Sequence, residues 1–198
     1  AWSLENGANA GFFRATAAAN TNMNIAPVAW GLWANSDDTA SAVRSLNAAM
    51  GVGSRFEVTL ENNWIDGGRS VGVAWGNGLG EYVLEFLFIG GQANYLVNDA
   101  TDGRDTGVAW TGDGVTLVLE LTSTNTYKLA MNGNEMTGTL KSRDDTVIRQ
   151  FRAWNYSAGS GGNYDVFLGD LNVTRLPWEG RSTSETVRIV REGIPYYV

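Results

Sequence analysis

The sequence predicts an all-β fold in which two antiparallel sheets pack face to face, and three observations support this. Apolar and polar residues alternate through most segments, as in strands that bury one face. Turn residues recur at short intervals, and the chain has 25 glycines but only 3 prolines. About twelve strands can be counted at regular spacing without a convincing helix, which implies a sandwich of two sheets.

In chain order, residues 1–10 are polar and small and predict an arm. A first short strand begins at residues 12–14, and VAWGLWA at residues 28–34 predicts a second strand. Residues 39–50, TASAVRSLNAAM, are also compatible with a helix because alanine and leucine are good helix formers. We prefer a strand at residues 42–46 because its neighbours are strands.

The next segments repeat the strand pattern. Further strands are expected at residues 54–61, 70–75, 82–89, 95–97 and 107–110. In the first of them, Phe56, Val58 and Leu60 alternate with polar residues and are predicted to face the core. The segment 82–89 is apolar on both faces apart from Glu85, as expected of a central strand covered on two sides.

The clearest signal lies at residues 114–140, where two alternating segments are followed by Asn132-Gly133. This dipeptide supplies the two positive φ values of a type I′ turn, so the chain should fold back with Leu129 roughly opposite Met136. Three consecutive antiparallel strands follow. The side chains predicted to face the core are those of Val115, Leu117, Leu119, Leu121, Tyr127, Leu129 and Met131.

The last third predicts long strands at residues 147–154 and 164–173, separated by a glycine-serine loop. Residues 176–180, LPWEG, interrupt the pattern, and one more alternating strand runs from Thr186 to Val190. A lone strand cannot satisfy its own backbone, so it must pair with an edge of this domain, of a neighbouring domain or of another copy. We therefore expect a sandwich domain at residues 1–178 and a tail strand at residues 179–198.

Composition excludes several functions. The net charge of −7 and the 14 scattered Lys and Arg residues argue against nucleic acid as a partner. Cysteine and histidine are both absent, which removes disulfides, thiolate and histidine catalysis and the usual zinc ligands. The apolar runs are too short for a membrane span. The N-terminal segment lacks an initiator Met and a basic, apolar signal, and with the low charge it suggests a processed, secreted protein or an excised module.

Two stretches, residues 94–131 and 148–175, resemble the concanavalin A-like, laminin-G-like sandwich modules of secreted bacterial proteins in their strand rhythm and turn sequences. The closing segment with Asp165, Asp170 and Asn172 is similar to the last core strand of those modules. The resemblance implies a jelly-roll fold, attachment to glycan-active or surface proteins, and often a structural calcium ion. It carries over no particular binding residue, because the ligand loops of these modules vary.

A calcium site is one reading of the loop NDATDGRD, where Asp99, Asp102 and Asp105 follow Asn98 on one turn-rich segment. Hard cations take several oxygen ligands, and the spacing of these aspartates permits them to ligate one cation together. The spacing differs from that of an EF-hand, and Arg104 weakens the local negative potential. The alternative is ordinary capping of turns by aspartate side chains.

Carbohydrate binding is the function that the aromatic residues favour. Sugar rings stack on Trp and Tyr faces while planar polar groups bind the hydroxyls. Several of the 8 tryptophans lie in or beside polar loops. Trp30, Trp33 and Trp75 lie within strands and are expected in the core, and most of the other tryptophans can also be core residues. The candidate carbohydrate-binding residues are Trp64, Trp110, Trp154, Asn155, Tyr156 and Tyr164.

Catalysis is not expected. A retaining glycosidase needs two carboxylates about 5–5.5 Å apart, but Glu81 and Glu85 are separated by roughly 13 Å along a strand. A lyase needs a Tyr or His base beside Arg and Gln, and residues 149–156 offer such side chains without a partner signature. We therefore expect a noncatalytic extracellular lectin-like module. The alternative is a structural or adhesive subunit of a surface layer or filament, assembled through its C-terminal strand.

Overall fold

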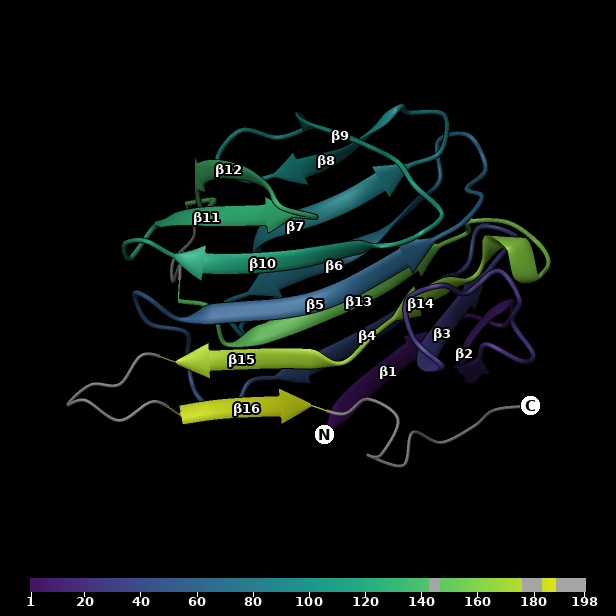
Figure 1. Ribbon diagram of the computed structural model, residues 1–198, viewed down its shortest axis with the longest axis horizontal. Helices are drawn as coiled ribbons and strands as arrows, with labels where there is room; N and C mark the ends of the chain where they lie inside the picture. The colour runs from purple at the N-terminus through teal and green to yellow at the C-terminus, as the bar shows by residue number, and fades with distance from the viewer. Residues whose placement is uncertain (143–146, 176–182, 188–198) are drawn as a thin grey trace.

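The computed structural model describes residues 1–142, 147–175 and 183–187, and shows two stacked layers of strands (Figure 1). The layer at the back is a seven-stranded antiparallel sheet. Its strands lie in the order β1 (Trp2–Asn6), β4 (Thr39–Ser45), β13 (Gln150–Tyr156), β6 (Ser70–Gly76), β7 (Tyr82–Ile89), β8 (Asn94–Asn98) and β9 (Arg104–Ala109).

The layer at the front of Figure 1 is a nine-stranded antiparallel sheet. Its main path is β12 (Asn134–Thr139), β11 (Thr126–Met131), β10 (Val115–Leu121), β5 (Arg55–Asn62), β14 (Val166–Leu168), β3 (Val28–Ala34) and β2 (Ala10–Thr16). β15 (Leu171–Arg175) pairs with β5 beyond β14, and β16 (Thr183–Val187) pairs with β15. Within the described residues, the one helical element is a 3₁₀ turn, η1 (Gly162–Tyr164). The predicted two-sheet, jelly-roll type of sandwich is confirmed.

The predicted hairpin is confirmed in detail. Asn132 and Gly133 have φ values of 47° and 86°, the two positive values of a type I′ turn. Leu129 pairs directly with Met136, and β10, β11 and β12 are consecutive antiparallel neighbours. The ambiguous segment after the second strand is also a strand, β4, and not a helix.

Two elements differ from the prediction. The expected N-terminal arm is strand β1, because its backbone extends the seven-stranded sheet beyond β4 while Trp2 packs edge-on against Trp30, with ring centroids 4.8 Å apart. The expected long strand at residues 164–173 is broken into η1, β14 and β15. Between Leu168 and Asn172 the chain carries one residue more than the β5 segment it pairs with, so a bulge interrupts the ladder.

The tail strand pairs inside its own domain. β16 adds to the edge of the nine-stranded sheet through β15, in a register that places Leu171 opposite Val187. The predicted strand began later, at Thr186, and its last residues, 188–190, lie outside the described part, as does the predicted domain boundary at 178/179. Pairing of this segment with another copy stays a prediction.

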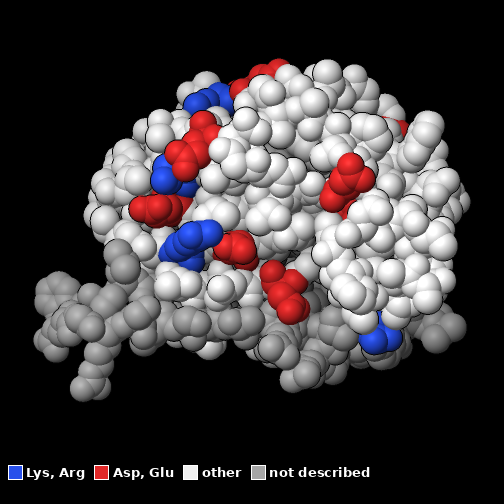
Figure 2. Space-filling model, in the orientation of Figure 1, with Lys and Arg blue, Asp and Glu red and all other residues white. Residues whose placement is uncertain are grey.

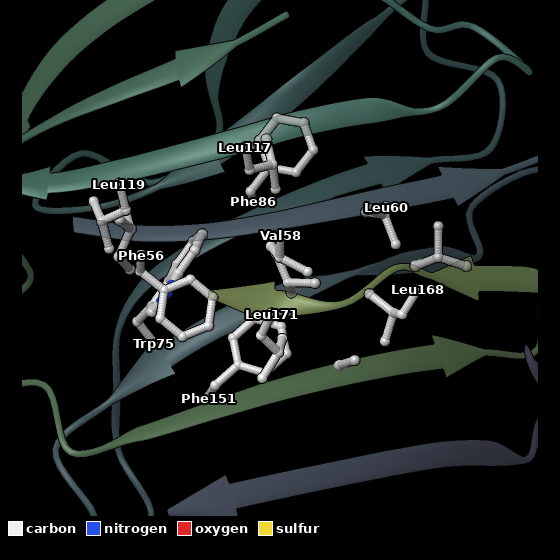
Figure 3. Close-up of a cluster of buried hydrophobic side chains, with 14 of the residues drawn as sticks. Phe56, Val58, Leu60, Trp75, Phe86, Leu117, Leu119, Phe151, Leu168 and Leu171 are labelled. Atoms are coloured by element: carbon white, nitrogen blue, oxygen red, sulfur yellow. The ribbon is translucent and has the colours of Figure 1, made fainter. Parts of the chain in front are cut away.

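The core lies between the sheets and is aromatic (Figure 3). Phe56 of β5 stacks on Phe151 of β13 with ring centroids 4.9 Å apart, and both meet Trp75 of β6 edge-on. The predicted inward residues of β5, β10 and β11 are confirmed, since all of them are buried. Trp30 and Trp75 are in the core as predicted, but Trp33 is only half-buried. The described residues contain no helix long and apolar enough to cross a membrane.

Candidate functional site

The outer face of the seven-stranded sheet carries a polar groove. Along β13, Phe151 and Ala153 point into the core, so Arg152 and the residues two positions away on either side point outward. A groove of about 730 Å³ runs over β1, β4 and β13 on this face. Its lining includes Glu5, Asp37, Asp38, Ser41, Tyr82, Gln150 and Arg152.

Arg152 is held between two aromatic rings. Its guanidinium carbon lies 5.2 Å from the ring centroid of Tyr82 and 5.1 Å from that of Trp154. Its Nε donates a hydrogen bond of 2.9 Å to Ser41 Oγ. Stacking on aromatic faces restrains a guanidinium and leaves its outer N–H groups directed at whatever occupies the groove.

Glycine in the neighbouring strand makes this arrangement possible. Gly72 of β6 pairs with Trp154, and a Cβ at this position would lie 2.8 Å from the indole ring. The absence of a side chain therefore lets the indole lie across β6 beneath Arg152. Substitution of Gly72 by a larger residue would displace the ring.

A second stacked arginine stands at the same end of the sheet. The Arg69 guanidinium lies 5.6 Å from the ring centroid of Tyr156, and its Nη1 donates a 3.3 Å hydrogen bond to the Tyr156 hydroxyl. Arg69 also forms an ion pair with Asp37. Asp37, one of the carboxylates that line the groove, is thus paired with a cation.

Electrostatics of the groove suit binding better than proton transfer. Burial raises the pKa of the Tyr82 hydroxyl above its usual range, although the positive charge of Arg152 acts in the opposite direction. A phenol with a raised pKa is a poor source of a phenolate base near neutral pH. Glu81 and Glu85, the carboxylates weighed for hydrolysis, have separate hydrogen-bond partners, Asn77 and Asn98.

Two of the predicted sugar-binding residues lie on this face, and one prediction is wrong. Trp154 and Tyr156 point outward, Trp154 against Arg152 and Tyr156 against Arg69, but Trp154 is only 6% exposed and acts mainly as the support of Arg152. Asn155 is fully buried on the core side, where its amide donates to the carbonyl oxygens of Leu32 and Tyr164. It cannot reach a ligand, because consecutive strand residues point to opposite faces.

The other predicted aromatics lie elsewhere. Trp64 is 67% exposed in the loop after β5. Trp110 is 38% exposed, stacks on Phe88 with ring centroids 5.9 Å apart and donates its indole N–H to the Asn62 carbonyl. Tyr164 is half-buried and packs against the core. The structure does not bring these three side chains into the groove.

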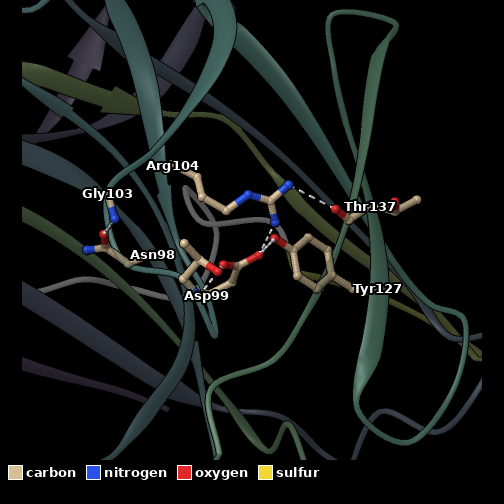
Figure 4. A network of polar contacts seen from close by, with 7 residues as sticks. Asn98, Asp99, Gly103, Arg104, Tyr127 and Thr137 are labelled. Atoms are coloured by element: carbon tan, nitrogen blue, oxygen red, sulfur yellow. Dashed lines mark hydrogen bonds and ion pairs between the residues drawn. The ribbon is translucent and has the colours of Figure 1, made fainter.

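The residues of the predicted calcium loop do not fit a metal ion. Asp99 points inward, where it accepts hydrogen bonds from Tyr127 Oη at 2.6 Å and from Arg104 (Figure 4). Asp102 forms an ion pair of 2.6 Å with Lys141, and Asp105 accepts from the Asn94 amide. Each carboxylate is directed to its own partner, and no group of three acidic side chains placed for a metal occurs in the described residues.

Tyr82, Ser41 and Glu5 are groove residues that the sequence did not single out. They come from β7, β4 and β1, and no local pattern joins these strands to β13. One signal was present in the sequence. Alternation along β13 alone places Gln150, Arg152, Trp154 and Tyr156 on one face.

Comparisons with known proteins agree on the fold. No family model and no curated protein sequence matches the chain. Among solved structures, a sialidase aligns with a TM-score of 0.61 and 8% identity over 93% of this chain, which spans only 17% of that protein. An alginate lyase of polysaccharide lyase family 7 aligns with a TM-score of 0.54 and 13% identity, over 82% of this chain and 81% of that one. Sheep galectin-11 aligns with a TM-score of 0.45 and 14% identity, over 66% of this chain and 95% of that one.

These similarities define the class of fold. The chain is a concanavalin A-like β-sandwich, as the resemblance of its strand rhythm implied. At such low identities the shared architecture carries no residue roles, so the groove has to be interpreted from its own chemistry.

Proposed function

We propose that the chain is a noncatalytic, extracellular or cell-surface carbohydrate-binding module whose glycan lies in the groove on the outer face of the seven-stranded sheet. The observation that carries the proposal is Arg152, stacked between Tyr82 and Trp154 in a groove of about 730 Å³. An arginine that is held by aromatic rings and does not pair with a carboxylate keeps N–H groups that can donate to hydroxyl or carboxylate oxygens of a sugar.

The remaining groove residues complete a sugar-binding surface. Gln150 and Ser41 offer both donors and acceptors, and Asp37 and Asp38 offer acceptors for hydroxyl groups. The groove crosses several strands and is open along its length, which suits a polysaccharide chain better than a small enclosed ligand. Sialidase and alginate lyase, whose names refer to carbohydrate substrates, share the fold, which is consistent with a glycan partner.

The chemistry of the described side chains argues against catalytic turnover of the bound glycan. Histidine is absent from the chain, and burial makes the Tyr82 hydroxyl a weaker acid. Glu85 is engaged with Asn98 and with Lys141, 3.9 Å away. A polysaccharide should therefore be bound and released without change.

The test is Arg152→Met in affinity electrophoresis and calorimetry against a panel of neutral and acidic polysaccharides. We expect binding to at least one polysaccharide by the wild type and a loss of about tenfold or more in the variant, equivalent to about 1.4 kcal/mol. Arg55→Met is the matched control. It removes the same charge from the opposite sheet, where Arg55 pairs with exposed Glu57, and should bind as the wild type does.

Three other outcomes would show which part of the proposal is wrong. Loss of binding in Trp64→Ala or Trp110→Ala with unchanged binding in Arg152→Met would move the site to the end loops. Release of unsaturated or reducing products from any polysaccharide would contradict the noncatalytic assignment. Absence of binding across the whole panel would count against the function itself.

A further inference from the structure

A second pocket lies on the outer face of the opposite, nine-stranded sheet, away from the glycan groove. It has a volume of about 390 Å³ and sits where β2 and β3 meet the glycine-rich loop before β14. Its size is within the range of small-molecule sites. The residues that line it include Phe13, Trp33, Asn35 and Asp165 and the glycines Gly159, Gly161 and Gly162.

The aromatic wall of this pocket is fixed by two cross-strand glycines. Trp33 of β3 pairs with Gly11 of β2, and Phe13 of β2 pairs with Gly31 of β3. A Cβ at Gly11 would lie 2.9 Å from the Trp33 indole, and one at Gly31 would lie 2.3 Å from the Phe13 ring. Each ring therefore lies across the neighbouring strand instead of turning into solvent, and both remain half-buried.

Asp165 is an unpartnered carboxylate in this aromatic pocket. It is 8% exposed, and its carboxylate has no hydrogen-bond or ion-pair partner among the described residues. Burial raises its pKa to about 7, and no interaction with another described residue opposes this shift. Other buried carboxylates of the chain are satisfied. Glu61 accepts from the backbone N–H groups of Asn24 and Ile25, and Asp99 accepts from Tyr127 and Arg104.

Some exposed charges on this sheet are also paired. Figure 2 shows acidic and basic side chains side by side over the β5, β10 and β11 end of the face, where Arg55 pairs with Glu57 and Lys128 with Glu120. The surface over β14 and β3 carries few charged side chains. No cation of the described residues is placed beside Asp165, whereas the exposed carboxylates of Glu57 and Glu120 each have one.

The chemistry of the pocket selects the kind of cation. A calcium ion takes six to eight oxygen ligands and a magnesium ion takes six in near-ideal octahedral geometry, whereas the pocket offers a single carboxylate beside aromatic rings. An organic ammonium group needs a counter-charge and aromatic surface, because the partial negative charge of ring faces attracts it and its carbon substituents are apolar. Phe13, Trp33 and Asp165 provide both.

We propose that this pocket binds an organic ammonium group, with Asp165 as the counter-charge and Trp33 and Phe13 as the aromatic wall. This site is separate from the glycan groove and independent of the function proposed for it. The ligand can be a free amine or an ammonium-bearing substituent of a larger molecule, and the pocket recognises the feature that they share.

The test uses choline, whose charge is permanent, and its neutral isostere 3,3-dimethylbutan-1-ol, each titrated by NMR and calorimetry at pH 8. We expect the wild type to bind choline at least tenfold more tightly than the neutral isostere. Asp165→Asn should lose at least tenfold in choline affinity and most of the preference for the charged probe. Affinity of the wild type should also fall at least fivefold between pH 8 and pH 5, because the carboxyl becomes protonated while choline stays charged.

Controls separate the pocket from general attraction to an acidic protein. Asp102→Asn removes one carboxylate whose side chain is 77% exposed, and should leave choline binding unchanged. Trp33→Ala should weaken binding in a protein whose unfolding transition remains cooperative. Equal binding of both probes, equal binding by Asp165→Asn, or no choline binding by the wild type would each overturn the proposal.

Discussion

Replacement of Asp99 by alanine is expected to lower the free energy of unfolding by roughly 2–4 kcal/mol, because it leaves a buried hydroxyl and a partly buried guanidinium without their acceptor. Asp99 is 2% exposed and accepts hydrogen bonds from Tyr127 Oη, from Arg104 and from the Thr101 backbone N–H. Arg104 is 32% exposed and can recover some hydration, which keeps the expected loss below that of a fully buried pair.

Urea unfolding of a double-mutant cycle measures this effect. Tyr127→Phe alone should cost less than Asp99→Ala, and the double variant should cost less than the sum of the two, since the hydrogen bond is lost only once. Asp105→Ala is the control from the same loop, because Asp105 is exposed and accepts from Asn94 at the surface. A loss below about 1 kcal/mol in Asp99→Ala would show that water replaces the network.

The same network shows why the spacing of the loop NDATDGRD was compatible both with a cation site and with turn capping. The loop and its turn-capping hydrogen bonds, such as Thr101 N–H to Asp99, follow from local sequence. The inward direction of Asp99 depends on Tyr127 in β11, on Arg104 in β9 and on the lack of a side chain at Gly138, where a Cβ would lie 2.3 Å from the carboxylate. The spacing of residues within the loop does not reveal that Tyr127, 28 positions away, is a partner of Asp99.

Strands and their core faces could be predicted because their causes are local. The alternation of β10 and β11 and the positive φ of Asn132 and Gly133 are properties of a short segment, and both were confirmed. The start of β1 could not be predicted in this way. Only Trp2 and Leu4 of its five residues are apolar, and it becomes a strand because β4 offers a free edge and Trp30 offers a partner for Trp2.

Prediction of the groove was partial for a related reason. Outward alternation along β13 was legible in the sequence, but the emphasis on loop aromatics drew attention to Trp64 and Trp110, which the fold places elsewhere. Asn155 was included because it adjoins Trp154, although adjacent strand residues face opposite ways. Residues two positions apart on a strand therefore predict a shared face of the sheet better than adjacent residues do.

Asp165→Asn is expected to stabilise the protein progressively as the pH rises from 4 to 8, by up to about 4 kcal/mol, on the basis of about 1.4 kcal/mol per pKa unit. The pKa of Asp165 is raised from 3.8 to about 7 by burial. Between these values the folded protein binds more protons than the unfolded chain, so stability declines with rising pH. Asparagine has a similar shape and does not ionise, so it avoids this decline.

The measurement is urea unfolding of both proteins at several pH values without choline, compared with Asp102→Asn. The exposed Asp102 variant reports the effect of removing one negative charge from a chain of net charge −7, and its difference from wild type should change much less with pH. A difference for Asp165→Asn that stays constant from pH 4 to pH 8 would contradict the assignment of an uncompensated buried carboxyl. A protein that keeps such a group at a cost in stability has the trade-off expected of a binding residue, since an isosteric amide would serve the fold better.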